Sequence, residues 1–245
     1  MHRFFMDEQG IKNDSACLEP SDAYHATKVL RLTQGDEVVL MDGQALYLAS
    51  VAEMDGGAVR CDHVKELPSP EASLCITLYQ GLPKADKLEW IVQKCTEAGV
   101  MAIAPIAMTR CVSVVDGKDA PKKQERWQRI VREAAKQSGR AVIPQVHMPM
   151  TLAKALEQLK KHELVLVPWE EAEGSGPRMV HEKYPQVKDV AIVIGPEGGI
   201  APEEIEALKA KAGAVPITLG KRILRTETAG LAAAVALLAL WGDME

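Results

Sequence analysis

The sequence predicts a mixed α/β protein, in which a small β-rich domain precedes a larger domain built around a mostly parallel sheet with helices on both faces. Residues 1–70 contain short strand-like runs separated by glycine-containing turns. From residue 71 onward, apolar runs alternate with helical patterns, as in proteins with parallel sheets. Two glycine-marked loops follow the last two strand-like runs. We therefore expect two domains, residues 1–70 and 71–245.

The first domain is expected to be a small barrel with one helix. Asp-Gly turn signals separate its strand-like runs, which are residues 36–41, 45–54 and 58–67. A helix is expected over roughly residues 21–30, and Ser21 is a suitable N-cap. The segment Leu67-Pro68-Ser69-Pro70 is the expected linker, because two prolines disfavour both helix and sheet pairing.

The second domain shows repeated alternation of strand and helix. Its strand-like runs are residues 73–79, 101–108, 163–169, 190–194 and 215–219. Helical patterns cover residues 84–98, 121–138 and 151–161 and follow each glycine-marked loop. In the first of these helices, Leu88, Ile91, Val92 and Cys95 have the spacing of a buried face.

The composition is typical of a globular protein, with 47% hydrophobic and 26% charged residues and a net charge of -5. The beginning of the chain lacks the sustained apolar run of a signal peptide, and the apolar run 231–241 is too short to span a bilayer. Five scattered cysteines without a CxxC pair favour reduced thiols in the cytoplasm. The histidines lack metal-binding spacing, so no metal is expected.

A local excess of positive charge stands out on this acidic chain. Between Pro121 and Arg140 there are two acidic residues and seven basic ones, which are Lys122, Lys123, Arg126, Arg129, Arg132, Lys136 and Arg140. Most of them fall on the side of the helix opposite Trp127 and Val131. We interpret this basic stripe as an RNA-facing surface, although a solvated helix face is the simpler alternative.

The first glycine-marked loop, Gly195-Pro196-Glu197-Gly198-Gly199, follows a buried strand. It matches neither the dinucleotide motif GxGxxG nor the P-loop motif. Glu203 and Glu204, in the first turn of the next helix, would repel a phosphate, so a cationic cofactor without phosphates fits better. A tight turn without a ligand is the alternative.

The second loop, residues 219–230, places two aliphatic residues inside a polar segment. Ile223 and Leu224 would make sense packed on a flat apolar ring such as adenine. Thr226 or Thr228 is the expected N-cap of the alanine-rich terminal helix. Arg225 and Glu227 have simpler interpretations as a solvated arginine and a capping acid.

Several segments together resemble the RsmE family of SPOUT-type RNA methyltransferases. They are IGPEGG, LGKRILRTETA, residues 87–100, Glu125-Arg126-Trp127, residues 134–140, and His25 with Val29-Leu30-Arg31. The resemblance spans nearly the whole chain, with Cys95-Thr96-Glu97-Ala98 as a conservative departure. It implies methylation of N3 of a uridine in 16S ribosomal RNA by S-adenosylmethionine, a step of ribosome biogenesis. It also implies a PUA-like RNA-binding barrel, a SPOUT domain with a trefoil knot, and a homodimer.

The reaction requires loss of the uridine N3 proton, which a general base or a cation beside the developing charge could favour. We favour Arg225 as that cation, while the base stays open between Glu197, Glu227, Glu97 as a third candidate, and no carboxylate at all. The resemblance also implies which residues bind the cofactor and the RNA. The expected cofactor-binding residues are Pro168, Ile194, Gly195, Pro196, Glu197, Gly198, Gly199, Leu219, Gly220, Ile223, Leu224, Arg225 and Thr226. The expected RNA-binding residues are Arg3, Arg31, Lys94, Arg126, Arg129, Arg132, Lys136 and Arg140.

Two other functions remain open at this point. One is a non-catalytic RNA-binding protein that has kept the fold and binds no cofactor. The other is an enzyme that acts on a phosphorylated small molecule, which the acids Glu203 and Glu204 argue against.

Overall fold

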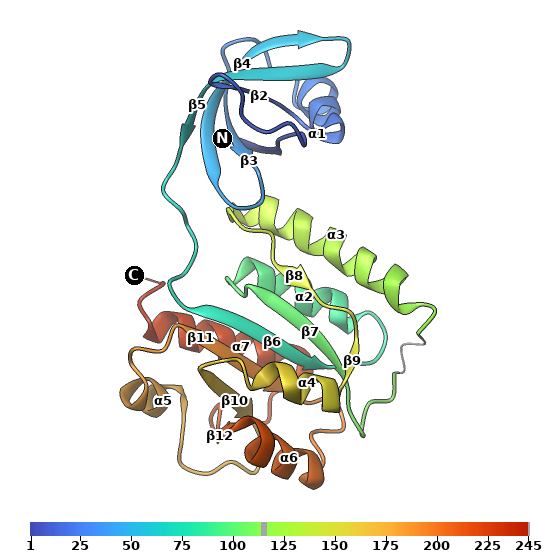
Figure 1. Ribbon diagram of the computed structural model, residues 1–245, viewed down its shortest axis with the longest axis vertical. Coiled ribbons are helices and arrows are strands. Elements are labelled where there is room, and N and C mark those ends of the chain that lie inside the picture. Colours follow the sequence, from blue (N-terminus) through green and yellow to red (C-terminus); the bar gives the residue numbers. More distant parts are fainter. Residues whose placement is uncertain (114–116, 245) are drawn as a thin grey trace. The chain divides into compact units, whose positions relative to one another are not determined.

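A computed structural model describes residues 1–113 and 117–244 of the chain (Figure 1). It consists of two compact units. The first unit comprises residues 1–71 together with residues 135–143, and the second comprises residues 72–134 and 144–245.

The first unit is a five-stranded sheet with the order β1-β3-β4-β5-β2. Its strands are β1 (His2–Phe5), β2 (Ser15–Cys17), β3 (Glu37–Met41), β4 (Leu46–Asp55) and β5 (Ala58–Glu66). A bridge between Met6 and Leu18 joins the chain after β1 to the chain after β2, so the two edges of the sheet meet as in a barrel. The interior is filled by buried side chains such as Phe4, Leu40 and Val59.

The helix of this unit differs in detail from the expected one. Helix α1 (Pro20–Tyr24) begins one residue before Ser21, and its N-cap is Glu19. A π-helical turn, η1 (His25–Val29), continues it, as Figure 1 shows beside the strands. Proline is favoured in the first helical turn because that position needs no backbone donor, which explains why the helix starts at Pro20.

The second segment of the first unit, residues 135–143, was not separable from the second domain by its sequence pattern. Ala141 is fully buried against Phe5, Val39 and Met41. The Glu71 carboxylate accepts hydrogen bonds from the backbone N–H groups of Ala141 and Val142 at 2.8 and 3.1 Å. These apolar and polar contacts attach the end of helix α3 (Ala120–Ser138) and the chain after it to the strands.

The second unit contains a parallel sheet of seven strands with the order β12-β10-β11-β6-β7-β8, and β9 also pairs with β7. The strands are β6 (Cys75–Gly81), β7 (Ala102–Ala107), β8 (Gln145–Val146), β9 (Met150–Thr151), β10 (Leu164–Pro168), β11 (Asp189–Ile194) and β12 (Val215–Ile217). Because every pair is parallel, all carboxyl ends lie at one edge of the sheet.

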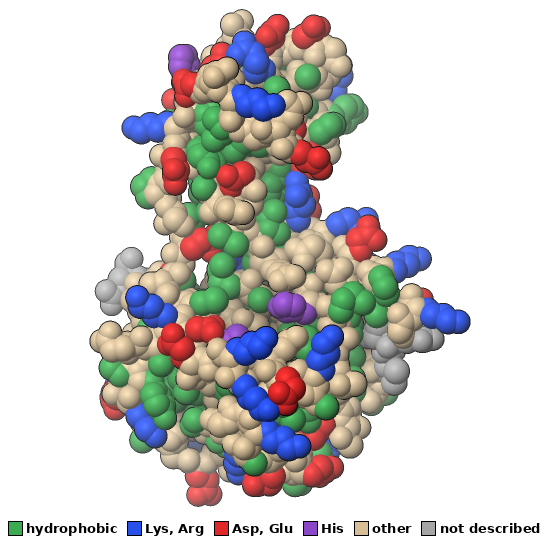
Figure 2. All heavy atoms as spheres, viewed as in Figure 1, with side chains coloured by type: hydrophobic (Ala, Val, Ile, Leu, Met, Phe, Trp, Pro, Cys, Tyr) green, Lys and Arg blue, Asp and Glu red, His purple; other side chains and the backbone are tan. Residues whose placement is uncertain are grey.

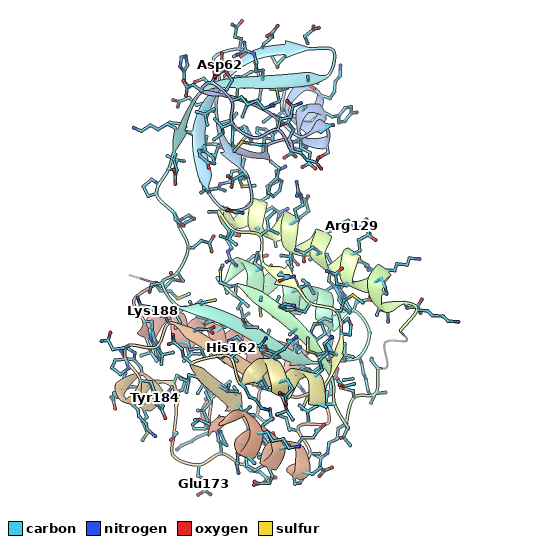
Figure 3. The ribbon with its side chains drawn as sticks, in the orientation of Figure 1. Asp62, Arg129, His162, Glu173, Tyr184 and Lys188 are labelled. Atoms are coloured by element: carbon cyan, nitrogen blue, oxygen red, sulfur yellow. The ribbon has the colours of Figure 1, made fainter. Side chains whose placement is uncertain are left out.

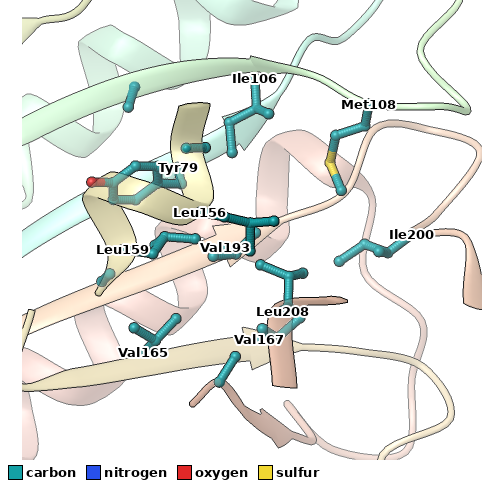
Figure 4. Packing of buried hydrophobic residues seen from close by; sticks show 14 of the residues in the cluster. Tyr79, Ile106, Met108, Leu156, Leu159, Val165, Val167, Val193, Ile200 and Leu208 are labelled. Atoms are coloured by element: carbon teal, nitrogen blue, oxygen red, sulfur yellow. The ribbon is translucent and has the colours of Figure 1, made fainter. Parts of the chain in front are cut away.

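Helices cover both faces of this sheet, as expected from the alternating pattern. They are α2 (Lys87–Glu97), α4 (Leu152–Leu159), α5 (Pro177–Lys183), α6 (Pro202–Ala212) and α7 (Thr226–Leu240). On one face, α4 and α6 pack on side chains such as Tyr79 and Val193 (Figure 4). On the other face, α7 packs on β11 and β6 and contacts α2 and α5.

Two features follow from the second face. The predicted buried side of α2, Leu88, Ile91, Val92 and Cys95, is buried. A Cβ atom at Gly230 would lie 3.3 Å from both methyl groups of Leu78, so only a small residue lets α7 approach β6 this closely. The chain thus returns from edge strand β12 to the middle of the sheet, which brings the start of α7 beside the carboxyl ends of β6 and β11.

Candidate active site

A cavity of about 560 Å³ opens at the carboxyl ends of β10 and β11, where α7 begins. Its lining includes Lys87, Pro168, Glu170, Ile194 to Ile200, Ile223 to Glu227 and Ala229. A smaller hollow of about 130 Å³ adjoins it, shares Pro168, Ile223 and Leu224 with it, and adds Thr218 to Arg222. This size and position are typical of a ligand site in an open parallel sheet. The structure therefore brings both glycine-marked loops to one cavity.

The first loop depends on its glycines for local packing. A Cβ atom at Gly195 would lie 2.7 Å from Ile200 Cγ1 and 3.0 Å from the Gly199 carbonyl carbon. Gly199 has a φ of +73° and donates its N–H to the Pro196 carbonyl at 2.9 Å. Larger residues at these positions would push the loop out of this conformation, so the backbone that lines the cavity is specified by Gly195 and Gly199.

Two charged residues that the sequence pattern did not single out flank this loop. The Arg110 guanidinium donates to the Gly198 carbonyl at 3.1 Å. Glu170 lies so close to Gly199 that a Cβ atom there would be 2.9 Å from its carboxylate. They come from the segments that follow β7 and β10, so no local signal links them to the loop.

The second loop exposes apolar surface toward the cavity. Ile223 is 86% exposed although it lines both hollows, and Leu224 beside it is partly buried. Leu219 and Gly220 line the smaller hollow, and Gly220 has a φ of +102°. An exposed isoleucine in a concave site is unfavourable in water, so this surface suits a flat apolar group of a ligand.

The start of α7 corrects the expected helix cap. The N-cap is Arg225, and Thr226 is the first helical residue, so neither Thr226 nor Thr228 caps the helix. The buried Thr226 hydroxyl instead donates to the Gly195 carbonyl at 2.6 Å and accepts from the Gln80 amide at 2.9 Å. These bonds join the end of β6, the first loop and α7, which fixes the position of Arg225 at the edge of the cavity.

A lysine and two glutamates meet on the cavity wall. The Lys87 ammonium lies 3.2 Å from a carboxylate oxygen of Glu197 and 3.1 Å from one of Glu227. The backbone N–H of Lys84 also donates to Glu197, at 3.1 Å. Lys87 was not among the residues predicted for the site. Its place on the polar face of α2 was visible in the sequence, whereas its partners lie more than 100 residues away.

The contacts among Lys87, Glu197 and Glu227 shift the pKa values of all three side chains. Partial burial would raise the pKa of Glu197, but hydrogen bonds from the Lys84 backbone and from Lys87 outweigh it and lower this pKa. The pKa of Glu227 is lowered first by its own backbone N–H and then by Lys87. The hydrogen bonds to Glu227 and Glu197 raise the pKa of Lys87. Both carboxylates are therefore ionised at neutral pH and are weaker bases than ordinary glutamates.

The third candidate base lies elsewhere. Glu97 is at the other end of α2, about 15 Å from Lys87 along an 11-residue helix, and it pairs with Lys94 at 2.8 Å. Neither Glu97 nor Lys94 lines the cavity described above.

The two acids in the first turn of α6 differ in exposure. Glu203 is exposed, but Glu204 is only 4% exposed. Its carboxylate accepts from the N–H of Thr109 at 2.8 Å and from the N–H of Ala201 at 3.0 Å. Glu204 thus places its carboxylate on the N–H of the N-cap residue Ala201, which leaves the start of α6 poorly suited to phosphate.

Most of the basic residues predicted to bind RNA are exposed or partly buried, whereas Lys136 and Arg140 form ion pairs within the first unit. Arg31, Arg126 and Arg129 are exposed, and Figure 3 shows Arg129 projecting outward from α3. Arg126 also pairs with Glu89 at 2.8 Å. Arg132 is partly buried, and Arg3 lies 3.5 Å from the Gln137 carbonyl.

Lys136 and Arg140 have structural partners in the first unit. The Lys136 ammonium pairs with Asp22, which is 6% exposed. Arg140 is itself 6% exposed and binds the Glu71 carboxylate at 2.6 and 3.1 Å. The last two members of the basic stripe are therefore engaged in ion pairs, Arg140 as a buried residue and Lys136 as a partly buried one. On the face shown in Figure 2, Lys and Arg side chains are interspersed with Asp and Glu.

Residues 1–113 and 117–244 contain neither a membrane-spanning helix nor a metal-binding group of side chains. None of the helices there is long and apolar enough to cross a membrane. No group of three or more His, Cys, Asp or Glu side chains in these ranges could hold a metal ion.

Known protein families and curated relatives match most of the chain. The RNA methyltransferase domain family matches residues 70–238, and the RNA methyltransferase PUA domain family matches residues 18–62. "Ribosomal RNA small subunit methyltransferase E" of Mycobacterium bovis is 37% identical, over 96% of this chain and 88% of that protein. The protein of the same name from Bacillus subtilis is 34% identical, over 94% and 93%.

Solved structures of methyltransferases are similar to this chain over nearly its whole length. The ribosomal RNA small subunit methyltransferase E of Neisseria gonorrhoeae, bound to S-adenosyl methionine, is 31% identical and has a TM-score of 0.85, with all of both chains covered. A Legionella pneumophila protein in complex with SAM is 32% identical with a TM-score of 0.81, over 97% of this chain and 96% of that one. The expected fold class, a PUA-like domain followed by a SPOUT-type α/β domain, is confirmed. The chain belongs to the RNA methyltransferase family that includes the ribosomal RNA small subunit methyltransferase E proteins.

Proposed function

We propose that the protein methylates N3 of a specific uridine in 16S ribosomal RNA of the small subunit, with S-adenosyl-L-methionine as the methyl donor. The observation that carries this proposal is the single cavity formed by the two glycine-marked loops, which combines an apolar wall with an ionised carboxylate pair. The relatives named ribosomal RNA small subunit methyltransferase E support the RNA substrate. The uridine and its N3 atom rest on the family resemblance.

The residues present fit this cofactor. A volume of about 560 Å³ lies in the range of small-molecule sites. The aliphatic side chains of Pro168, Ile223 and Leu224 would contact its adenine, and the backbone of residues 194–199 and 219–220 would bind its polar atoms. Thr226 would support this backbone through Gly195. When bound, the cofactor supplies an electrophilic methyl group on a positively charged sulfur.

The side chains around the cavity suit a reaction at uridine N3. This nitrogen carries a proton, so the site must orient N3 and favour loss of that proton. Arg225 stays protonated, and we assign it the role of stabilising the negative charge that develops on the base. Glu197 and Glu227 are ionised acceptors on the cavity wall. Either could accept a hydrogen bond from N3–H, and correct orientation of the reactants is worth up to about 7–11 kcal/mol.

We assign RNA binding to the first unit and to the exposed part of α3. Arg3 and Arg31 are the candidate contacts in the first unit, and Arg126, Arg129 and Arg132 are the candidates on α3. Uridine N3 is masked in a base pair, so we expect the target base to be single-stranded or flipped out.

The assembly is proposed to be a homodimer in the cytoplasm. Apolar residues of α7 remain partly exposed, and they are Leu231, Ala232, Val235, Ala236 and Leu240. A second copy of the chain would bury this surface. The five free cysteines support a reducing compartment, where ribosomal subunits are also assembled.

The proposal is tested in two steps. Calorimetry on the purified protein should detect binding of S-adenosylmethionine at micromolar concentration. Small subunits isolated from a strain that lacks the gene should then accept one methyl group on a uridine when protein and cofactor are added, which mass mapping of the RNA locates. Cofactor binding without any methylation would favour another substrate. Absence of cofactor binding would favour the non-catalytic RNA-binding alternative.

A further inference from the structure

The side chain of Lys87 occupies an electrostatically unusual position. It is the first residue of α2, where the helix dipole places partial positive charge and disfavours a cation. Its side chain is 36% exposed, yet it turns toward two carboxylates instead of water. One of these carboxylates follows β11 and the other lies in the first turn of α7, so the ammonium joins three segments that are distant in sequence.

We propose that Lys87 is a positioning residue for methyl transfer, which holds the carboxylates of Glu197 and Glu227 together, ionised and oriented on the wall of the cofactor cavity. This inference rests on the proposed function for its catalytic meaning, but the geometry that carries it is independent of the substrate. The two Lys87–carboxylate distances, 3.2 Å to Glu197 and 3.1 Å to Glu227, lie within the range of N–H···O hydrogen bonds between oppositely charged groups.

The role follows from what the two glutamates would do without the lysine. Two carboxylates that are both within hydrogen-bond distance of one nitrogen lie close enough to repel each other. In such pairs one carboxyl group takes up a proton at higher pH than an isolated glutamate would. A protonated or rotated glutamate would no longer present the same acceptor to the substrate. Lys87 prevents this by neutralising one of the two negative charges.

Other charged groups near the trio do not replace Lys87. Among the described residues, the other charged and titratable groups in the cavity lining or in and beside its loops are Lys84, Arg110, Cys111, Glu170, Lys221, Arg222 and Arg225. Within that part of the chain, Lys87 alone forms a salt bridge with Glu197 or Glu227. Arg110 donates to the Gly198 carbonyl, and Glu170 adds a further negative charge. Arg225 lies on the cavity wall two residues before Glu227, where we assign it to the substrate.

The test compares Lys87→Met, which keeps the length of the side chain and removes its charge, with Lys87→Arg, which keeps the charge. Carbon-13 NMR of labelled glutamate carboxyl groups measures the pKa values of Glu197 and Glu227 in the protein without ligand. Signals are assigned with Glu197→Gln and Glu227→Gln. We expect both pKa values to rise in Lys87→Met and to stay low in Lys87→Arg. If Lys87→Met does not fold, Lys87→Gln takes its place.

Activity provides the second measurement. In Lys87→Met the acid limb of the pH profile of kcat/KM should move to higher pH, and kcat should fall by at least about tenfold, since misplacement by 1 Å can cost about a hundredfold. Lys87→Arg should restore the position of the acid limb. Lys160→Met is the matched control, because Lys160 pairs with Glu157 on the surface of α4, away from the cavity.

Two results would overturn the inference. One is a pair of carboxyl pKa values that is the same in wild-type protein and in Lys87→Met. The other is a Lys87→Arg variant whose pH profile is shifted as far as that of Lys87→Met. If the wild-type protein methylates no RNA, the proposed function fails while the NMR comparison still decides whether Lys87 controls the two carboxylates.

Discussion

Removal of the Glu71 carboxylate should destabilise the protein strongly, although Glu71 lies outside the proposed active site. Arg140 and Glu71 have side chains that are 7% and 13% exposed. The carboxylate accepts hydrogen bonds from the guanidinium, the shortest at 2.6 and 3.1 Å, and one each from the backbone N–H groups of Ala141 and Val142. Glu71→Ala removes one partner of a buried ion pair, which costs about 3–5 kcal/mol. For a chain of this length the Tm should fall by roughly 6–20 °C, at about 2–4 °C per kcal/mol.

The double variant Glu71→Leu with Arg140→Met separates loss of the pair from loss of one partner. Replacing both buried charges with apolar groups is often nearly neutral, so the double variant should be more stable than Glu71→Leu alone. Urea unfolding followed by circular dichroism measures the free energies of unfolding. Hydrogen exchange at the amides of Ala141 and Val142 reports on the first unit directly. Wild-type stability in Glu71→Ala would refute the assignment of a structural role to this ion pair.

The single variant Arg140→Met tests the role of Arg140, which the charge pattern assigns to the RNA surface. If Arg140→Met weakens RNA binding and lowers its salt dependence while stability is unchanged, then the burial argument is wrong and the charge pattern was the better guide.

Three further predictions concern the proposed reaction. Arg225→Ala should abolish turnover, while its affinity for S-adenosylmethionine stays within about tenfold of the wild-type value, or about 1.4 kcal/mol. Single-turnover assays measure the first quantity and calorimetry measures the second. Retained turnover would remove Arg225 from the mechanism. Arg129→Glu should weaken RNA binding and reduce the slope of log K against log salt by about 0.9 for each phosphate that is no longer neutralised. Lys160→Glu is the control and should leave the slope unchanged. An unaltered slope in Arg129→Glu would mean that this face of α3 does not contact RNA. Gly195→Ala should lower cofactor affinity at least about tenfold, because its Cβ atom would lie 2.7 Å from Ile200 Cγ1. Gly117→Ala serves as the control, because a Cβ atom there has no neighbour within 4 Å. Equal affinities of the two variants would show that the first loop tolerates the displacement.

Much of the architecture could be predicted because it depends on local patterns. The apolar spacing of α2 identified the residues that are buried, and the Asp-Gly turns separated β3, β4 and β5 close to their observed ends. The two glycine-marked loops pointed to one edge of a parallel sheet, where the cavity lies. These signals are periodicity, turn chemistry and strand polarity, which neighbouring residues carry among themselves.

What could not be predicted is which charged groups meet across the fold. A helical pattern assigned Arg129 and Arg140 to the same basic stripe, because periodicity gives the direction of a side chain and not its partner. Arg129 is exposed, whereas Arg140 is buried against a carboxylate 69 residues earlier in the chain. Lys87 presents the same difficulty at the proposed active site, since its partners are 110 and 140 residues away.

These two cases have a common physical basis, which explains why both concern lysine or arginine. A long cationic side chain can reach water from most positions on a helix, so its presence on a polar face is compatible with either solvent or a buried carboxylate. The choice depends on whether another segment brings a carboxylate within about 3 Å, and that is fixed only when the sheet order is formed. For Arg140 the result is attachment of residues 135–143 to the barrel, and for Lys87 it is control of the charge of Glu197 and Glu227. A substitution that removes the charge of Arg140 should therefore change stability first, whereas one that removes the charge of Lys87 should change the pH dependence of catalysis first.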